Sequence, residues 1–454
     1  MKLVTVTLLA MAMGCVQAES AMSKMSQVMS QKASFHKQKQ EAGVFAEKNY
    51  KSMGNVKCEN GEAGEYSCKN VDIIGSITHE AMGSTSREGN DIWGWTSDDG
   101  REFAIVGQTD GTAFVEITKS KSLKYRGRLP TQTDVAIWRD IKVIDHHAYI
   151  SSESHMHGMQ VFDLHKLLDL GENADPKVFD IHSDLTALFT DVGAAHNVIA
   201  NPETKTIYLS GGSNATCQGL NQGLMIIDVK NPSKPTLQGC FGEGDYVHDA
   251  RCVTYHGPDT RFDGRQICLT YNIHSFMVYD VTDPKNPRIL SNNYYDGIDG
   301  KGAYTHQGWE LDQDWRYMLM DDEQDEAVRN EREQFDDLKT RTYIWDISSL
   351  TDPVMTGVYK SPVDAIDHNL YIKNHTAYMA NYASGLRVVD ASSVIQDPTG
   401  QGMREVAYFD CWPQDDDEPE VAFYGAWSSY IWFPSGTVVL NCIETGMFAL
   451  DVHV

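Results

Sequence analysis

One short motif recurs seven times in this chain and limits the fold more than any other feature. Each copy has three mostly apolar residues, then an acid, then a further apolar residue; the copies lie at residues 113–117, 160–164, 225–229, 277–281, 343–347, 387–391 and 448–452. The separation of their acids runs from 44 residues (Asp346 to Asp390) to 66 residues (Asp280 to Asp346). Repeats of about 40 to 50 residues with about four strands each are typical of propeller blades. We therefore predict an all-β fold, a seven-bladed β-propeller.

The ends of the repeat region predict how the ring of blades closes. The last repeat supplies strands near 427–433, 437–443 and 446–452, which leaves its blade one strand short. Residues 71–77 lie before the first blade and resemble the fourth strands of other repeats, such as 124–129 and 354–359. Because an unpaired edge strand invites aggregation, we expect this N-terminal strand to complete the last blade.

The first 18 residues have the pattern of a secretory signal peptide. Lys2 supplies positive charge, residues 3–16 are largely apolar, and Ala18 ends a small-residue cleavage site. A transmembrane anchor needs about 20 apolar residues, and Gln17 and Glu19 end this run too early. We expect a secreted, extracellular protein without a membrane span, divided into a signal peptide (1–18), a helical or flexible leader (19–57) and the propeller (58–454).

Cysteine usage fits an oxidising compartment. Loss of the signal peptide removes Cys15 and leaves eight cysteines, an even number that predicts disulfides. Eight cysteines allow 105 connectivities, so the sequence leaves the pairing open. The candidate pairs are Cys58 with Cys68, Cys252 with Cys268, Cys217 with Cys240, and Cys411 with Cys442. The spacing within these pairs is not the CxxC of a structural zinc site.

The net charge of −26 limits the classes of partner. Binding to nucleic acid or to an anionic membrane requires a Lys/Arg surface that this composition does not supply. The simplest role of the acidic surface is solubility outside the cell, and attraction of cations toward an acidic cleft is the alternative. The sequence also has neither a Gly-x-Ser-x-Gly elbow nor a phosphate-binding glycine loop, so serine hydrolases and nucleotide enzymes gain no support.

Alignment of the repeats places histidines at one position of four consecutive blades. The seven innermost strands are expected to begin at Trp93, Arg139, His196, His248, His306, His368 and Trp427. The first residues of inner strands line the mouth of a propeller's central channel. The four histidines are therefore expected to converge there.

Four converging imidazoles predict a metal site. Imidazole binds zinc, copper, iron and similar ions, and we expect His196, His248, His306 and His368 to hold one divalent transition metal: Zn, Fe, Cu or Mn. Glu153, Asp322 and Glu323 lie on loops that open at the same rim and are expected to orient the imidazoles or carry protons. Arg139 enters the same ring and is expected to orient an anionic group of a substrate.

A structural role for the same histidines is the alternative. Repeats copy residues by descent, and a histidine at the start of an inner strand can simply bond the backbone of the neighbouring blade. Separately, Asn214 and Asn374 fit the N-glycosylation pattern, which matters only in a eukaryotic protein.

Several stretches resemble the LVIVD-repeat, choice-of-anchor B proteins, which are secreted propellers with varied or absent C-terminal anchors. The resemblance extends over about residues 58–451 and is carried by residues 89–95, 110–115, 138–143, 304–309, 366–371 and 380–382. It implies an exported propeller and brings no biochemical activity with it.

Two functions follow from these patterns. The first is a secreted metal-dependent enzyme, of hydrolase or oxygenase type, that acts on a small anionic or polar substrate. The second is a non-catalytic extracellular binding or adhesion propeller that recognises a protein or glycan partner.

Overall fold

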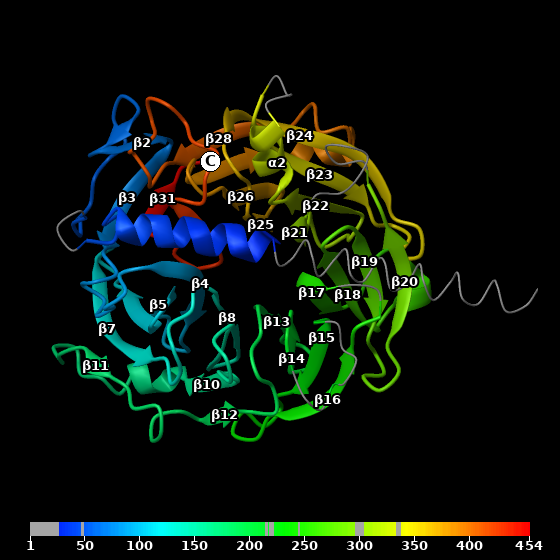
Figure 1. Cartoon of the computed structure of the whole chain (residues 1–454), viewed down its shortest axis with the longest axis horizontal. Helices are drawn as coiled ribbons and strands as arrows, with labels where there is room; N and C mark the ends of the chain where they lie inside the picture. Colours follow the sequence, from blue (N-terminus) through cyan, green and yellow to red (C-terminus); the bar gives the residue numbers. More distant parts are fainter. Residues whose placement is uncertain are drawn as a thin grey trace, which may run out of the picture.

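A computed structural model describes residues 27–46, 50–213, 217, 222–243, 246–295, 304–332 and 337–454. Seven antiparallel sheets follow one another in sequence order around a central channel, as predicted (Figure 1). The signal peptide and Asn214 lie outside the described residues. Asn374 is exposed in the turn between two strands of the sixth blade.

The first four blades each run from the innermost to the outermost strand. Blade one contains β4 (Gly89–Thr96), β5 (Glu102–Gln108), β6 (Gly111–Ile117) and β7 (Leu123–Pro130), with β11 (Lys177–Val178) parallel to β7. Blade two contains β8 (Arg139–Ile144), β9 (His147–Ser152), β10 (Met159–Asp163) and β12 (Ala187–Phe189). Blade three contains β13 (Asn197–Asn201), β14 (Thr206–Ser210), β15 (Leu224–Asp228) and β16 (Thr236–Phe241). Blade four contains β17 (Val247–Thr254), β18 (Gln266–Asn272), β19 (Phe276–Asp280) and β20 (Arg288–Asn293).

Among the last three blades, blade five carries an added helix and blade six two added strands. Blade five contains β21 (Thr305–Glu310), β22 (Tyr317–Asp322), β23 (Lys339–Asp346) and β24 (Val354–Asp364), with the helix α2 (Asp325–Arg332) after β22. Blade six contains β25 (Asn369–Lys373), β26 (Thr376–Ala380), β27 (Leu386–Asp390) and β28 (Arg404–Phe409), extended by β2 (Tyr66–Lys69) and β1 (Glu62–Ala63). Blade seven contains β29 (Ala426–Tyr430), β30 (Val438–Cys442), β31 (Gly446–Val452) and β3 (Val71–Ile77). Three short 3₁₀ turns span Leu164–Leu167, Thr260–Phe262 and Ser392–Ile395.

The recurring motif forms the third strand of every blade, and its acid has a local structural role. In five blades the motif carboxylate accepts a hydrogen bond from the backbone N–H two residues on; these acids are Asp163, Asp228, Asp280, Asp346 and Asp390. This is the turn that an aspartate favours at the end of a strand. In these five blades the motif acid therefore marks the place where the third strand stops and turns.

The predicted closure of the ring is confirmed. Strand β3 pairs antiparallel with β31, with Ile73 opposite Leu450 and Ile77 opposite Met447. Between blades seven and one, Ile74 and Val439 pack with Ile92 and Val106 in one buried cluster. The N-terminal strand thus joins the last blade to the first.

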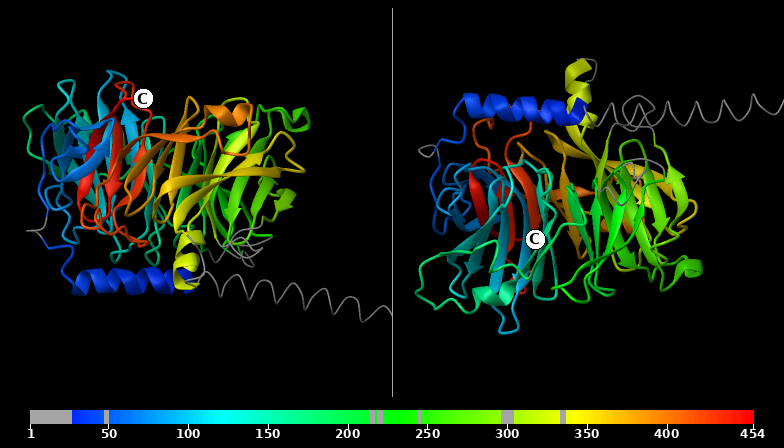
Figure 2. Two further views of the ribbon diagram at one scale, coloured as in Figure 1. Left: turned by 90° about the horizontal axis from the view of Figure 1, so that it is seen from above. Right: turned by 60° about the horizontal axis from the view of Figure 1, so that its bottom comes forward.

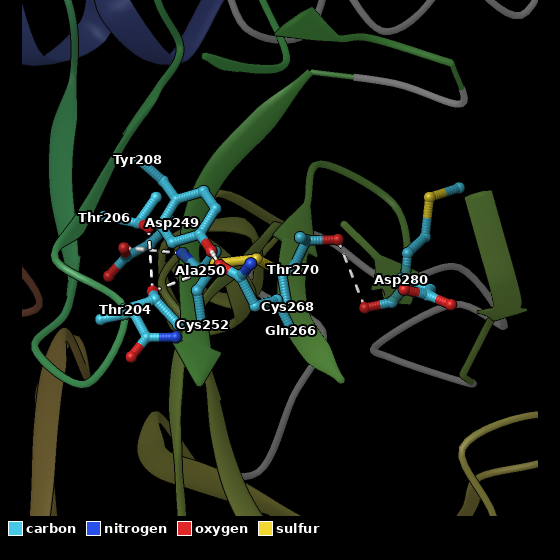
Figure 3. Close-up of a disulfide and its surroundings, with 12 residues drawn as sticks. Thr204, Thr206, Tyr208, Asp249, Ala250, Cys252, Gln266, Cys268, Thr270 and Asp280 are labelled. Carbon is cyan, nitrogen blue, oxygen red and sulfur yellow. Dashed lines mark hydrogen bonds between the residues drawn. A yellow bond between two sulfur atoms is a disulfide. The ribbon is translucent and has the colours of Figure 1, made fainter. Parts of the chain in front are cut away.

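All four candidate cysteine pairs form disulfides: Cys58–Cys68, Cys217–Cys240, Cys252–Cys268 and Cys411–Cys442. The Cys252–Cys268 bridge crosses directly between β17 and β18, where the two residues are paired across the strands (Figure 3). Four disulfides are typical of proteins that fold in an oxidising compartment. Within the described ranges, the structure has no helix with the length and hydropathy to cross a bilayer.

A helix at residues 27–41 lies across one end of the propeller. Figure 1 looks down the channel and shows this helix, in blue, crossing the middle of the ring. Figure 2 shows it flat against the outside of the blades, on the same end as α2. Farther along the leader, Met53 and Val56 form backbone bridges to Ser76 and Ile73 of β3.

Candidate metal centre

Side-chain bridges between neighbouring blades identify the ring position of each inner strand. Asp91 accepts a hydrogen bond from the backbone N–H of Ile141, Asp140 from Val198, and Gln307 from Leu370. The residue directly before each of these acceptors occupies the ring position of its blade. Around the ring, the residues at this position are Asn90, Arg139, His196, His248, His306, His368 and Trp427. The four histidines occupy equivalent positions and line one small cavity, whereas in blade one Asn90, and not Trp93, occupies the ring position. The motif spacing missed this because β4 begins at Gly89, four residues before Trp93.

Each ring histidine has a hydrogen-bond acceptor for its Nδ1–H. His248 Nδ1 lies 2.9 Å from the carbonyl oxygen of His306, His306 Nδ1 lies 2.9 Å from that of His368, and His368 Nδ1 lies 2.6 Å from that of Trp427. His196 Nδ1 lies 2.5 Å from Oε1 of Glu153. A carbonyl oxygen can only accept a hydrogen bond, so Nδ1 carries the proton in the imidazoles of His248, His306 and His368.

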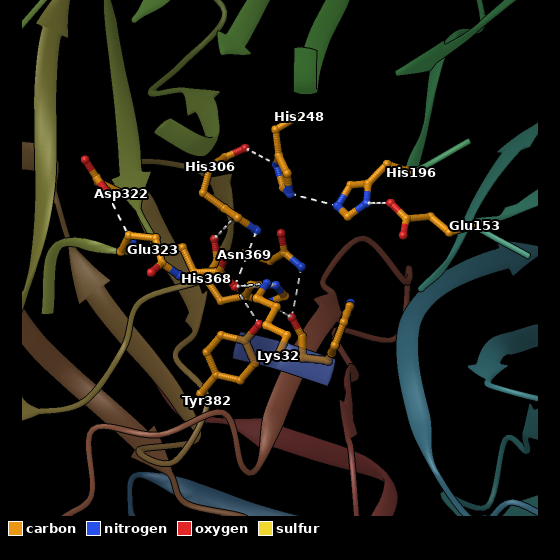
Figure 4. A network of polar contacts seen from close by, with 12 residues as sticks. Lys32, Glu153, His196, His248, His306, Asp322, Glu323, His368, Asn369 and Tyr382 are labelled. Atoms are coloured by element: carbon orange, nitrogen blue, oxygen red, sulfur yellow. Dashed lines mark hydrogen bonds and ion pairs between the residues drawn. The ribbon is translucent and has the colours of Figure 1, made fainter. Parts of the chain in front are cut away.

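The Nε2 atoms are the nitrogens left for a ligand. His196 Nε2 and His248 Nε2 are 2.8 Å apart (Figure 4). On the other side of the ring, Oε1 of Glu323 lies 3.9 Å from His306 Nε2 and 3.7 Å from His368 Nε2. Two nitrogens with bonds of about 2.1 Å to one ion must lie within about 4.2 Å of each other, and the His196–His248 pair meets this condition.

The four histidines do not all gather on one point in this arrangement. Among the described residues, His306, Glu323 and His368 form a group whose potential ligand atoms all lie within 4.8 Å of one another. His196 and His248 form the other half of the ring. Next to the four imidazoles, a cavity of about 20 Å³ is also lined by Asp140 and Asp249. That volume is the size of one water molecule or ion.

Burial keeps three of the ring imidazoles neutral, those of His248, His306 and His368. Desolvation, together with the neighbouring His306 and His196, lowers the pKa of His248 far below its ordinary value. Burial and the proximity of His368 and Lys32 do the same to the pKa of His306. Burial lowers the pKa of His368 to about 3. Neutral imidazole is the form that binds a metal.

Glu323 carries a permanent charge at the ring, although it is fully buried. Burial would raise the pKa of its carboxyl, but Lys32 and His368 and the hydrogen bonds from Lys32 and Tyr382 lower it to about 2. Lys32 Nζ and the Tyr382 hydroxyl each lie 2.6 Å from Oε1 of Glu323.

Lys32 comes from the helix that crosses the channel mouth. A second buried lysine of this helix, Lys39, lies 2.9 Å from Oε1 of Glu444, and Phe35 packs edge-on against Tyr424 with ring centroids 4.8 Å apart. His36 lies 2.7 Å from Glu88. The helix therefore covers the mouth through ion pairs to several blades, and its Lys32 ammonium reaches the histidine ring.

The other predicted site residues lie as follows. Glu153 contacts His196, whereas Asp322 accepts hydrogen bonds from the Tyr295 hydroxyl and the backbone N–H of Tyr304. Arg139 is buried, with Nε 3.0 Å from the Gln108 carbonyl oxygen and Nη1 3.1 Å from His157 Nε2. The roles expected of Asp322 as proton carrier and of Arg139 as partner of an anionic substrate stay predictions.

Sequence reasoning placed Tyr382 at this rim but missed Lys32. The helix places Val28, Lys32, Phe35 and Lys39 at intervals of four, three and four residues, which is one face of a helix. Val28, Lys32 and Lys39 are buried. This spacing could have indicated a helix with one buried face. The many polar residues of the leader made that face hard to recognise.

Comparison with known proteins supports the repeat. The family model of the LVIVD repeat matches residues 219–242, a stretch that contains β15 and β16 of blade three and one of the seven motif copies. The search of curated proteins gives no match. The chain thus carries an LVIVD repeat within a seven-bladed propeller.

Proposed function

We propose that this protein is a secreted, metal-dependent enzyme whose channel mouth binds one divalent transition metal through His196, His248, His306 and His368, whose side chains must move closer together to share one ion. The N-terminal helix covers this site. The observation that carries the proposal is the hydrogen bonding of Nδ1 around the ring.

All four Nδ1 atoms have an acceptor, so all four Nε2 atoms can present a lone pair toward the channel mouth. Three of the acceptors are backbone carbonyl oxygens, which can only accept and therefore fix the proton on Nδ1. The fourth acceptor is the carboxylate of Glu153. A hydrogen bond of this kind to the outer nitrogen is the usual support of a metal-bound histidine.

The contact between His196 and His248 strengthens this argument. Because Nδ1 of His248 is a donor and the ring is neutral, its Nε2 is an acceptor and lies 2.8 Å from Nε2 of His196. Without an ion, this contact requires a proton between the two Nε2 atoms. A metal shared by the two Nε2 atoms satisfies both rings in their neutral form.

A bound metal would polarise a carbonyl or phosphoryl oxygen or lower the pKa of a water molecule. The chain's own contribution is to orient the imidazoles, to place the negative charge of Glu323 beside them and to exclude bulk water. A small polar substrate that enters at this mouth reaches the ring when the helix at 27–41 moves away.

The second candidate is a binding propeller in which the ring has a structural role. The covering helix favours it, because a closed mouth admits no substrate. This candidate predicts a stable ring without a metal.

Metal titration separates the two candidates. Untagged protein is stripped with a chelator, and Zn²⁺, Cu²⁺, Mn²⁺ and Fe²⁺ are titrated separately by calorimetry. We expect one site per chain for at least one ion, and affinity losses of more than about 100-fold in His248→Ala and in His306→Ala, since loss of an outer-shell partner alone costs about 10–100-fold.

His256→Ala is the matched control, because His256 is an exposed histidine that pairs with Asp263. Circular dichroism shows whether each variant is folded. Failure of every ion to bind stoichiometrically, or binding that survives both ring substitutions in folded protein, overturns the proposal.

A further inference from the structure

A cavity of about 1090 Å³ lies at the opposite end of the channel from the histidines. Its walls are the C-terminal ends of the inner strands and the turns that follow them, for example Ala250–Thr254 and Glu310–Trp315. The histidines stand at the N-terminal ends of the same strands. Lys142 lies between the two ends, because it lines both this cavity and the small one beside the histidine ring.

Three half-buried tryptophans and a tyrosine form a cluster in this wall. The ring centroid of Trp432 lies 5.6 Å from that of Trp93 and 5.6 Å from that of Trp309. Tyr371 contacts all three, with centroids 5.1 to 5.6 Å away. A monomeric protein seldom places this much aromatic surface in an open cavity unless the surface binds something.

Two of these aromatic rings already have a cationic side chain of the protein against one face. Lys142 Nζ lies 4.6 Å from the centroid of Trp93, and the Arg251 guanidinium lies 4.0 Å from that of Trp309. Arg251 is held there by Glu310 through two hydrogen bonds of 2.8 and 2.6 Å. The cluster therefore has its cations in place, which disfavours a cationic ligand.

The rest of the lining is polar and carries more acid than base. Glu203 and Asp314 are exposed at the rim, and Asp312 lies 3.1 Å from His375 Nε2. Lys373 is the basic group beside them. This rim repels anions and offers many acceptors for hydroxyl donors.

We propose that this cavity binds a neutral oligosaccharide. A pyranose has flat C–H faces and an edge of hydroxyl groups, so it needs an aromatic surface and surrounding acceptors together. Trp432 with its neighbours supplies the surface, and Glu203, Asp312 and Asp314 supply the acceptors. The volume, at the upper end of the usual range for small-molecule pockets, has room for more than one sugar unit.

The test is a titration of the full chain with four soluble tetrasaccharides: cellotetraose, laminaritetraose, chitotetraose and maltotetraose. Tryptophan fluorescence and calorimetry follow the binding. We expect saturable binding of at least one tetrasaccharide with Kd below about 1 mM, which persists after metal is removed with a chelator. That persistence separates this site from the proposed metal centre.

Two variants locate the binding. Trp432→Ala is expected to weaken it at least about tenfold. Glu203→Gln changes an exposed side chain without risk to the fold and is expected to weaken it several-fold. Tyr294→Ala removes an exposed aromatic residue outside the cavity and should bind like the parent.

Three results overturn the proposal. They are the absence of saturable binding for all four sugars, unchanged affinity in both cavity variants, and binding of benzyltrimethylammonium or of a tetragalacturonate in place of the neutral sugars. The last result assigns the cavity to a charged ligand.

Discussion

Each ring histidine makes a hydrogen bond through Nδ1 to the next blade or to a glutamate, and its Nε2 faces the channel mouth. The structural and metal-binding interpretations of these residues are therefore compatible, since Nδ1 serves the fold and Nε2 is available for an ion. Sequence alignment located all four histidines, because each is fixed by the start of an inner strand. It also placed Glu323 at the same rim, but not specifically against His306 and His368, since that contact depends on how blade five packs on blade six.

Another buried histidine, His79, makes the stability of the fold depend on pH. It is 1% exposed, and its Nε2–H donates to the Cys442 carbonyl oxygen at 2.8 Å. Burial lowers its pKa to about 4, while the unfolded chain keeps the ordinary value of 6.5. Between these values the unfolded state binds more protons, so the free energy of unfolding falls as the pH drops, by roughly 3 kcal/mol in total.

His79→Gln keeps a side-chain donor but cannot titrate. Urea unfolding at pH 7 and pH 4.5 should therefore show a smaller loss of stability in the variant than in the parent. Equal losses in the two proteins would mean that His79 is not the titrating group.

At the scale of elements, the helix at 27–41 decides whether the ring is accessible. It brings two buried lysines to two buried glutamates, Lys32 to Glu323 and Lys39 to Glu444. The sequence indicated a helical or flexible leader but not its docking, because docking depends on acids more than 290 residues away in the chain. The third strands, in contrast, were predictable because their signal is local and repeated.

Lys32→Met is expected to tighten binding of Zn²⁺ at the ring by about tenfold or more. The ammonium lies 2.6 Å from Glu323 and so repels an ion held by the neighbouring histidines, and its loss also frees that carboxylate. Calorimetry on the metal-free protein measures the change. Lys37→Met, on the exposed side of the same helix, is the matched control. Equal affinities in the two variants would show that Lys32 does not act on the ion.

At the scale of the whole molecule, closure by β3 makes seven similar blades one unit. The count of blades followed from the motif, and the missing fourth strand followed from the incomplete last repeat. In blade one the two ends of the channel could not be assigned in advance: Trp93 was expected at the histidine end and lies in the opposite cavity, because its strand starts at Gly89, four residues earlier than the motif spacing indicated.

Ile73→Ala tests this closure. Ile73 is fully buried in β3 opposite Leu450, so its truncation should lower the free energy of unfolding by about 2–5 kcal/mol. Urea unfolding should remain a single transition, since blades one and seven share a core. Val354→Ala, at an exposed strand position, should change stability by less than about 0.5 kcal/mol. A separate early transition in Ile73→Ala would show that the blades unfold independently.

The central claim is that imidazole nitrogens of the channel mouth hold a metal. X-ray absorption at the zinc edge of protein loaded with one equivalent of Zn²⁺ reports the ligands directly. The account predicts nitrogen ligands at about 2.0–2.1 Å with the multiple-scattering pattern of at least three imidazoles, reduced by one in His248→Ala. A spectrum of oxygen ligands alone, or one unchanged by that substitution, would contradict it.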